Sequence, residues 1–370
     1  MTSLKDYKQF FEIALENSYS TSPPAVLYQP IYYLLNLGGK RLRPVLTLMA
    51  ADIFGNNHRK AIDAALAVEI FHNFTLMHDD IMDSAPLRRG SDTVHNKWNT
   101  NTAILSGDAM MILAYQALES YKDPLFRKLN SLFSKTAIEV CKGQQYDLDF
   151  ETQLEVTQGD YLEMIRLKTA VLVGCSLKMG ALIGGANQAD SKNLYDFGVL
   201  LGIAFQIQDD YLDAYANSES FGKQLSGDII ENKKTILYHQ AMENGSSKEK
   251  TTLRNWFSTE VKEKDVSKKI NAVKSLFDKT GASDASKALV IKYTQAAFEK
   301  LDILDISDKN KIIFKKTDAL SFILKTKITF DLILIKQTIH LLKKKKILNF
   351  LSICKKRLNT NGKIIILSLD

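Results

Sequence analysis

Apolar residues recur at every third or fourth position through most of the chain, which is the spacing of one face of an α-helix. Only six prolines interrupt the 370 residues, so the periodic segments can be long. The pattern predicts an all-α core, with helices over residues 4–20, 25–36, 45–54, 61–78, 101–121, 126–142, 160–186 and 198–215.

The pattern changes after residue 308. Short apolar runs at 311–314, 330–335 and 363–369 predict strands, with a lysine-rich helix and a turn over 359–362 between the last two. Residues 309–370 hold 14 Lys and one Arg against three Asp, a net charge of +12, whereas the 34 basic and 39 acidic side chains before them give −5. We therefore expect a helical domain over 1–308 and a small, lysine-rich, α/β-like appendage over 309–370.

Segments 330–334 and 358–366 of the appendage loosely resemble the later half of a Rossmann-type methyltransferase. The Gly-rich loop that would bind the cofactor is missing, and about 60 residues bury little core, so we expect no methyl transfer. A packed appendage, a poorly ordered segment and a gene-fusion or frame-error product remain open. Lys343 to Lys346 could touch an anionic membrane, although a solvated helix face is the simpler interpretation.

The composition is that of a soluble globular protein, with 45% hydrophobic and 25% charged residues. The first residues lack the apolar core of a signal peptide, and no apolar run approaches the roughly 18 residues that span a bilayer. Three scattered cysteines without metal or disulfide spacing suit a reducing compartment. We therefore expect a cytoplasmic protein without stable membrane insertion. The mildly acidic body does not indicate a nucleic-acid partner.

Two acidic triplets of identical spacing each follow an apolar helix. Residues at i and i+4 of a helix lie on one face about 5.4 Å apart, so their like charges repel each other unless a cation compensates them. Mg²⁺ does so with oxygen ligands and commonly bridges to substrate phosphates. One triplet can be a solvated helix end, but a pair of them predicts a metal and diphosphate site. The triplets are Asp79, Asp80 and Asp83, then Asp209, Asp210 and Asp213.

Basic residues accompany the triplets. The Gly38-Gly39 pair ends a helix and places Lys40 and Arg43 at the start of the next one, where anions are favoured. Arg88 and Arg89 follow the first triplet, and they can either pair with its carboxylates or bind a diphosphate. The small-residue-rich segment 160–186 contains a lysine, Lys168. Burying a lysine without a partner is costly, so we expect Lys168 to face either solvent or an anionic site.

As a set, these motifs resemble the trans-isoprenyl diphosphate synthases, also called polyprenyl synthetases, over about residues 5–305. The resemblance implies an all-helical isoprenoid-synthase bundle around a central cavity, usually as a homodimer, with the triplets facing each other across the cavity mouth. It rests on Gly38–Pro44, Asp79–Asp83, Leu87–Gly90, Gly143-Gln144, Lys168-Thr169, Phe205-Gln206 with Asp209–Asp213, and Gly222-Lys223, all in the family's order.

The resemblance also implies a role for each matching residue. About three Mg²⁺ would bind Asp79, Asp83 and Asp209 directly, with Asp80, Asp210 and Asp213 as further ligands or one layer out. Arg88, Lys168, Thr169, Gln206, Lys223 and Lys233 would bind the allylic diphosphate, and Lys40, Arg43, His72 and Arg89 would bind isopentenyl diphosphate. Asp79, Asp83, Asp209 and Lys168 would be the catalytic group. His78, beside the first triplet, would only orient it.

The chemistry implied is head-to-tail prenyl transfer. Metal ions and fixed cations stabilise the charge that develops as the carbon–oxygen bond of the allylic diphosphate breaks, and the double bond of isopentenyl diphosphate then attacks the allylic cation. In the family the released diphosphate is thought to take the proton, so no side-chain nucleophile is needed. Two alternatives are a class I terpene cyclase and a non-catalytic subunit of a heteromeric synthase. Cyclases usually lack a second aspartate triplet, and non-catalytic subunits tend to lose one.

Product length is expected to depend on the residues upstream of the first triplet. In the family a bulky side chain there forms the cavity floor, and Phe74, five residues before Asp79, fits that role. Thr75 stands four before and Phe71 eight before, on the same helix face as Phe74. An aromatic at five before without one at four before resembles the twenty-carbon type. We therefore expect geranylgeranyl diphosphate, with farnesyl diphosphate as the alternative, unless these rings are ordinary core.

Overall fold

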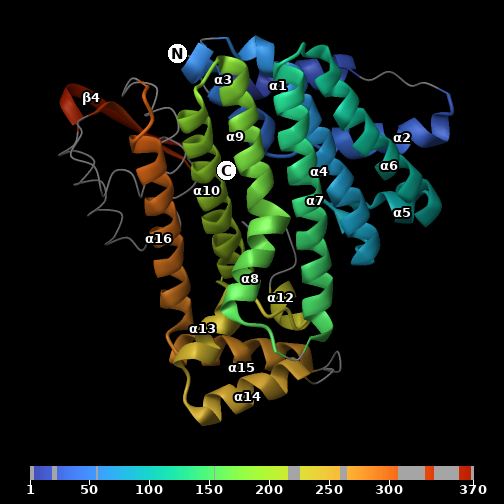
Figure 1. Cartoon of the computed structure of the whole chain (residues 1–370). Coiled ribbons are helices and arrows are strands. Elements are labelled where there is room, and N and C mark those ends of the chain that lie inside the picture. Colours follow the sequence, from blue (N-terminus) through green and yellow to red (C-terminus); the bar gives the residue numbers. More distant parts are fainter. Residues whose placement is uncertain are drawn as a thin grey trace. The chain divides into compact units, whose positions relative to one another are not determined.

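The structure of the chain is a computed structural model (Figure 1). It describes residues 4–18, 23–55, 57–153, 155–215, 226–258 and 265–306, together with the backbones of two strands at 330–336 and 358–367. The chain divides into two compact units, Met1–Leu304 and Asp305–Asp370, which are described separately. The assignment of 1–308 as a synthase domain and of 309–370 as an incomplete α/β fragment stays a prediction.

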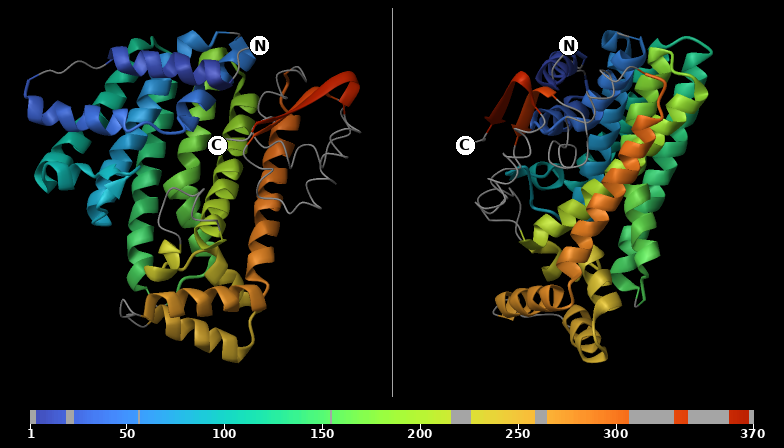
Figure 2. Two further views of the ribbon diagram at one scale, coloured as in Figure 1. Left: turned by 180° about the vertical axis from the view of Figure 1, so that it is seen from behind. Right: turned by 90° about the vertical axis from the view of Figure 1, so that its left-hand side faces the viewer.

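The first unit is built from helices, as the periodicity predicts. Within it, α3 packs along α9, α9 along α10 and α10 along α16, while α4 packs on α6. The shorter helices α13, α14 and α15 gather at one end of the long ones (Figures 1 and 2). The bounds are α1 Leu4–Ser18, α2 Ala25–Asn36, α3 Leu42–Gly55, η1 His58–Ala61, α4 Ile62–Met82, α5 Val94–Lys97, α6 Thr100–Gln116, η2 Ala117–Ser120, α7 Leu125–Thr152, α8 Gln158–Ile165, η3 Arg166–Ala170, α9 Val171–Gly184, α10 Gln188–Tyr215, α12 Gly227–Ile230, α13 Ile236–Asn244, α14 Ser247–Ser258, α15 Val266–Lys279 and α16 Ala282–Asp302. A short antiparallel hairpin with two residues in each strand, β1 Leu87–Arg88 and β2 Ser91–Asp92, follows α4.

The small-residue-rich segment lies at the centre of this unit. A β-carbon at Gly180 of α9 would stand 2.1 Å from the carbonyl oxygen of Thr47 in α3, so only glycine allows these backbones to approach so closely. Gln158–Gly184 is long and apolar enough to cross a membrane by length and composition, contrary to the sequence expectation. Its most apolar window has a mean hydropathy of 1.4 and is 67% buried inside the protein, so the segment is a core helix.

Several predicted helices differ from the observed ones. The helix predicted over 198–215 begins ten residues earlier, at Gln188. The helix predicted over 126–142 continues to Thr152, because Gly143 does not end it. The helix predicted over 61–78 continues to Met82, so the first triplet lies on its last turn. The helix predicted over 160–186 is interrupted by a π-helical turn over Arg166–Ala170. Single π turns inside α-helices are frequent at functional sites, and this one carries Lys168.

The described part of the second unit is a pair of parallel strands, β3 Phe330–Lys336 and β4 Leu358–Leu367. The predicted strand at 330–335 is thus found, as is the one at 363–369 as far as residue 367. The predicted turn over 359–362 is wrong, because those residues lie within β4, where the pairing passes irregularly from Phe330↔Leu358 to Leu332↔Lys363. The predicted strand at 311–314 and the lysine-rich helix with Lys343 to Lys346 lie outside the described residues.

Candidate active site

One lysine connects the first acidic triplet to a neighbouring helix. The ammonium of Lys168, on the π-helical turn, lies 2.6 Å from Asp147 Oδ2 of α7 and 3.4 Å from Asp79 Oδ1 of α4. The predicted choice for Lys168, solvent or an anionic site, is therefore resolved in favour of the anionic site. The carboxylates of Asp147, Asp79 and Asp83 act against the effect of burial and raise the pKa of Lys168, which keeps it charged.

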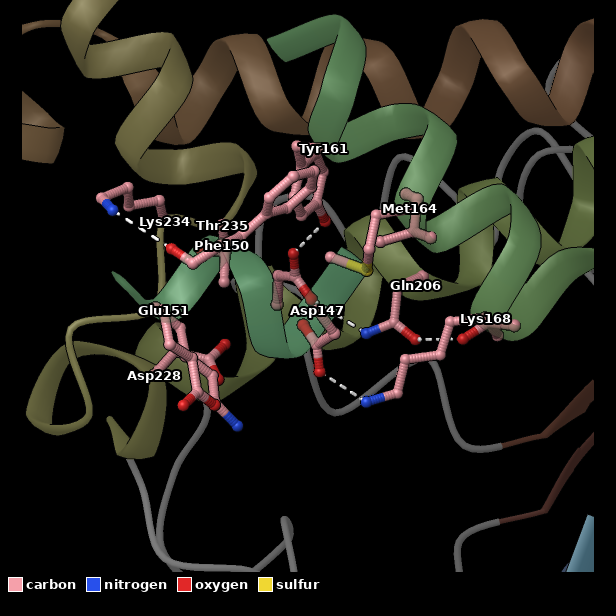
Figure 3. Close-up of a pocket in the computed structure, with 14 residues that line it drawn as sticks. Asp147, Phe150, Glu151, Tyr161, Met164, Lys168, Gln206, Asp228, Lys234 and Thr235 are labelled. Atoms are coloured by element: carbon pink, nitrogen blue, oxygen red, sulfur yellow. Dashed lines mark hydrogen bonds and ion pairs between the residues drawn. The ribbon is translucent and has the colours of Figure 1, made fainter. Parts of the chain in front are cut away.

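A pocket opens beside this lysine and reaches the second triplet (Figure 3). Its polar lining comes from α7, α8, the π-helical turn, α10, α12 and the residues after α12. Figure 3 shows the side chains of Asp147, Lys168 and Gln206 converging there. The lining residues are Asp147, Phe150, Glu151, Tyr161, Met164, Ile165, Lys168, Thr169, Gln206, Asp210, Asp228, Lys233, Lys234 and Thr235.

A line of hydrogen bonds crosses this pocket. The Thr169 hydroxyl donates to Gln206 Oε1 at 3.2 Å, and Gln206 Nε2 donates to Asp210 Oδ1 at 3.0 Å. The Tyr161 hydroxyl donates to the other oxygen of Asp210. Asp210 is thus buried and oriented by two donors, while Asp209 beside it is half-buried.

The third member of the second triplet holds the next helix. Asp213 accepts hydrogen bonds from the backbone N–H groups of Gly227 and Asp228, each at 3.2 Å, and so caps the start of α12. This brings Asp228, which no sequence motif singled out, to the pocket wall. Burial and the charges of Asp210 and Asp213 raise the pKa of Asp228.

Burial, together with repulsion from a neighbour in the same triplet, raises the pKa of one carboxylate in each triplet. Desolvation by the surrounding protein and the charge of Asp79 raise the pKa of Asp83 to about 6. Burial and then the charge of Asp209 raise the pKa of Asp210. Such raised values indicate negative charge that the protein does not fully compensate. Hard divalent cations prefer carboxylate oxygens of this kind, so the donor set fits Mg²⁺.

The carboxylates do not form a closed metal cage by themselves. Within the ranges that the structure describes, no three His, Cys, Asp or Glu side chains converge closely enough to hold an ion. The residues fit ions that share their ligands between protein and phosphate oxygens, which is how Mg²⁺ is commonly held.

The middle residue of the first triplet has an arginine partner. Asp80 is 2% exposed, and Arg88 Nε donates to both of its oxygens at 2.8 Å while Nη2 donates to Oδ1 at 2.6 Å. Burial is the main effect on Asp80 and raises its pKa, whereas Arg88 lowers it. The two alternatives for the arginines were pairing with a carboxylate and binding a diphosphate. In this structure Arg88 pairs with the carboxylate of Asp80.

A second group of predicted residues forms a separate, electropositive cluster. Arg43 Nη1 lies 3.2 Å from His72 Nε2, and Arg89 Nη1 donates to the carbonyl oxygen of Gly38. A β-carbon at Gly39, where φ is +137°, would stand 3.0 Å from the Arg89 guanidinium, so the glycine pair is required for this approach. Burial, then the charges of Arg43 and Arg89, lower the pKa of His72 and keep it neutral.

A buried ion pair fixes the loop that carries this cluster. Arg41 Nη1 lies 2.5 Å from Glu69 Oε1 of α4, with both side chains less than 6% exposed. Arg41 has a φ of +51°, an uncommon conformation for arginine that the ion pair stabilises. Neither residue was among the predicted site residues, although Arg41 lies inside the Gly38–Pro44 motif. Lys40, beside it, is exposed.

The remaining predicted ligands have different placements. Lys233 lines the pocket, lies 3.0 Å from Glu231 and has its pKa raised chiefly by that carboxylate against the effect of burial. Lys223 lies outside the described residues, as does Gly222. His78 is not among the residues that line the pocket, and its Nε2 lies 3.2 Å from the carbonyl oxygen of Ile104 in α6.

The aromatic residues upstream of the first triplet stack on one another. The ring centroids of Phe71 and Phe74 are 5.4 Å apart, and Phe71, which is fully buried, also lies 5.3 Å from Phe133 of α7. Phe74 is 8% exposed. The Thr75 hydroxyl donates to the backbone carbonyl of His72 at 2.7 Å, so this small side chain adds no bulk beside the ring.

Asp147, Tyr161 and Asp228 are among the pocket residues that the sequence analysis did not predict. Asp147 lies four residues after Gly143 and therefore on the same helix face, a spacing that could have indicated it. Tyr161 and Asp228 stand alone in sequence and reach Asp210 only through the fold. No local sequence signal distinguishes them from other tyrosines and aspartates of the chain.

Comparison with known proteins identifies the family. Residues 24–274 match the model of the polyprenyl synthetase family. A geranylgeranyl diphosphate synthase of Methanosarcina mazei is 38% identical over 313 residues, 84% of this chain and 94% of its own length. Component 2 of the heptaprenyl diphosphate synthase of Bacillus subtilis is 33% identical over 301 residues, 81% of this chain and 83% of that protein.

A crystal structure of a geranylgeranyl pyrophosphate synthase superimposes with a TM-score of 0.84 at 47% identity, covering 87% of this chain and 99% of that one. The predicted all-α isoprenoid-synthase fold is therefore confirmed. The chain belongs to the polyprenyl synthetase family, as a short-chain trans-prenyltransferase.

Proposed function

We propose that this chain condenses isopentenyl diphosphate with an allylic diphosphate, in a Mg²⁺-dependent reaction, to give geranylgeranyl diphosphate. The observation that carries the proposal is the position of Lys168 between Asp79 and Asp147, in a pocket that also contains Asp210. A cation in a pocket that carboxylates of both triplets reach suits a ligand that brings both negative oxygens and metal ions. A diphosphate with Mg²⁺ is such a ligand.

Each of the two clusters would bind one of the two substrates. Lys168, Thr169, Gln206 and Lys233 would bind the allylic diphosphate, while Arg43, His72, Arg89 and the exposed Lys40 would bind isopentenyl diphosphate. Neutral His72 can accept from Arg43 and donate to a phosphate oxygen through its other nitrogen. The separation of the clusters keeps two highly charged substrates apart until the allylic bond breaks.

The acidic residues would hold the metal. Asp79, Asp83 and Asp209 would be direct ligands, while Asp80, Asp210 and Asp213 would keep their places through Arg88, Tyr161 and the start of α12. Bound Mg²⁺ supplies neutralisation of the departing diphosphate, which is otherwise a poor leaving group. The count of about three ions remains part of this proposal.

The decisive experiment is incubation of the full chain with Mg²⁺, isopentenyl diphosphate and each of the dimethylallyl, geranyl and farnesyl diphosphates, followed by chromatography of the products. We expect linear geranylgeranyl diphosphate. Farnesyl diphosphate as the end product would support the alternative length, a cyclic hydrocarbon would support a terpene cyclase, and no turnover would support a non-catalytic subunit.

The same purified sample tests assembly. We propose a homodimer in the cytoplasm, and sedimentation would distinguish it from a monomer. The similarity to one component of a two-component heptaprenyl synthase makes a second, different subunit the alternative. Turnover by the purified chain alone would contradict that alternative.

A further inference from the structure

A buried lysine far from the predicted motifs holds one wall of the pocket. Lys269 of α15 is 1% exposed, and burial lowers its pKa. Its ammonium donates to the carbonyl oxygen of Ile230 at 3.2 Å and to Asn232 Oδ1 at 2.5 Å. Burying a lysine away from solvent is costly, and these two hydrogen bonds offset part of that cost. The predicted site residues do not include Lys269.

The two acceptors lie at the end of α12 and just after it, because Ile230 is the last residue of α12 and Asn232 stands two residues further on. The segment 226–233 contains α12, begins at Ser226 and turns at Asn232. Both Ser226 and Asn232 have left-handed φ values, +62° and +61°, that non-glycine residues rarely adopt. Such conformations persist only where surrounding contacts hold them. A four-residue helix between two strained turns therefore depends on ties to its neighbours.

Three such ties are present. Asp213 of α10 accepts from the backbone at the start of α12, as described above. Lys234 donates to the carbonyl oxygens of Phe150 and Gln153 at the end of α7, at 3.2 and 2.6 Å. Lys269 holds the turn between these two ties and is the only one of the three that comes from α15 (Figure 1).

The segment carries two side chains that line the pocket. Asp228 stands two residues before Ile230, and Lys233 directly follows Asn232. The backbone N–H of Lys233 donates to the carbonyl oxygen of Asp228 at 2.9 Å, so a shift of the turn moves both residues together. Lys233 is charged and close enough to Asp83 and Asp147 for their carboxylates to raise its pKa.

We propose that Lys269 is a positioning residue that fixes the Ile230–Asn232 turn and thereby places Lys233 and Asp228 against the allylic diphosphate and its metal ions. The inference rests on the proposed function for the assignment of that pocket. Lys269 touches neither substrate nor metal, and it acts through the backbone of the turn.

The test compares Lys269→Met with Lys269→Arg, using Lys268→Met as the matched control, because Lys268 is the exposed neighbour on the same helix. Methionine keeps the length and apolar stem but leaves both oxygens without their donor. Arginine retains a donor. Binding of inorganic diphosphate in the presence of Mg²⁺ is measured by calorimetry, KM for each substrate by steady-state kinetics, and folding by thermal unfolding.

For Lys269→Met we expect inorganic diphosphate to bind about tenfold more weakly, because a charged donor to buried oxygens is lost. KM for the allylic substrate should rise by a similar factor while KM for isopentenyl diphosphate stays within about twofold of wild type. Lys269→Arg should recover most of the affinity, and Lys268→Met should match wild type.

Unchanged diphosphate affinity in a folded Lys269→Met protein would overturn the proposal. An equal loss for both substrates with a lowered unfolding temperature would also overturn it, since that marks a purely structural role. Should the wild-type chain bind diphosphate but form no product, the proposed function fails, while the binding comparison still decides the role of Lys269.

Discussion

A buried histidine lies behind the tyrosine that orients Asp210. His239 of α13 is 5% exposed, its ring lies 5.5 Å from the Tyr161 ring, and its Nε2 is buried without a hydrogen-bond partner among the described residues. Burial lowers the pKa of His239 to about 4. The imidazole therefore stays neutral behind the tyrosine that orients Asp210.

This histidine predicts a pH dependence of stability. Its folded pKa of about 4 is below the ordinary 6.5, so the unfolded chain takes up a proton between these values and the folded protein does not. The stabilisation is present above pH 6.5 and is lost as the pH falls towards 4. It amounts to about 3 kcal/mol at most.

We expect His239→Gln to reduce the loss of unfolding free energy between pH 6.5 and 4.5, measured by urea titration at each pH. Titrating carboxylates affect wild type and variant alike, so the difference between the two slopes isolates the histidine. Parallel slopes would mean that His239 is not held neutral.

Another residue-scale prediction concerns product length. The ring of Phe74 packs on Phe71, which in turn packs on Phe133. Removing the Phe74 ring should therefore deepen the substrate cavity by about one helical turn, 5.4 Å. We expect Phe74→Ala to lengthen the products and Thr75→Phe, which adds a ring beside it, to shorten them. Chromatography of the chain lengths is the measurement.

Truncating a buried phenylalanine costs about 3–5 kcal/mol, so Phe74→Leu, which keeps more of the packing, is tested in parallel. Identical product lengths in folded Phe74→Ala, Phe74→Leu and wild type would show that the floor lies elsewhere.

At the scale of elements, the crossing of α7 with the π-helical turn sets the position of Lys168. A β-carbon at Gly143 would lie 2.2 Å from the backbone nitrogen of Lys168 and 2.6 Å from its α-carbon. Asp147, one helical turn along α7, receives the ammonium of the same residue. Gly143 thus leaves room for the backbone of Lys168, and Asp147 binds the side chain of Lys168.

We therefore expect Gly143→Ala to displace the π-helical turn, because overpacking of a closed contact costs about 1–3 kcal/mol. KM for the allylic substrate should rise and the unfolding temperature should fall. Gly159→Ala is the control, since its β-carbon would have its nearest neighbour at an ordinary 3.6 Å. If both variants behave like wild type, the contact does not position Lys168.

This crossing also explains why some parts of the fold could be predicted from the sequence and others could not. The helix over 25–36 was predicted with its observed bounds, because its apolar period lies between clear breaks. The end of α7 was missed because glycine is usually a helix stop, and its packing against residue 168 is a long-range contact that local patterns do not contain. The paired triplets and the Gly38-Gly39 loop were predicted from spacing. Tyr161, Asp228 and Lys269 were not, since only the fold brings them together.

At the scale of the whole molecule, the family match ends before the charge boundary at residue 308. The family match ends at residue 274, and α16, the last described helix of the first unit, ends at Asp302. The described residues of the active site all lie before α16. The appendage therefore contributes none of the described site residues.

We expect a chain truncated after residue 308 to retain the activity and unfolding temperature of the full chain. Parallel assays of the two proteins at equal concentration provide the measurement. A soluble, folded truncation without activity would contradict the assignment of 309–370 as a dispensable appendage.

The bridge made by Lys168 has a consequence for ligand entry. Its ammonium has two anionic partners, Asp147 and Asp79. Under the proposed function, an arriving diphosphate would therefore substitute its oxygens for these carboxylates, and recognition would be an exchange of counter-ions. The same carboxylates would compete for Lys168 when the inorganic diphosphate departs, so the protein would supply its own displacing anion.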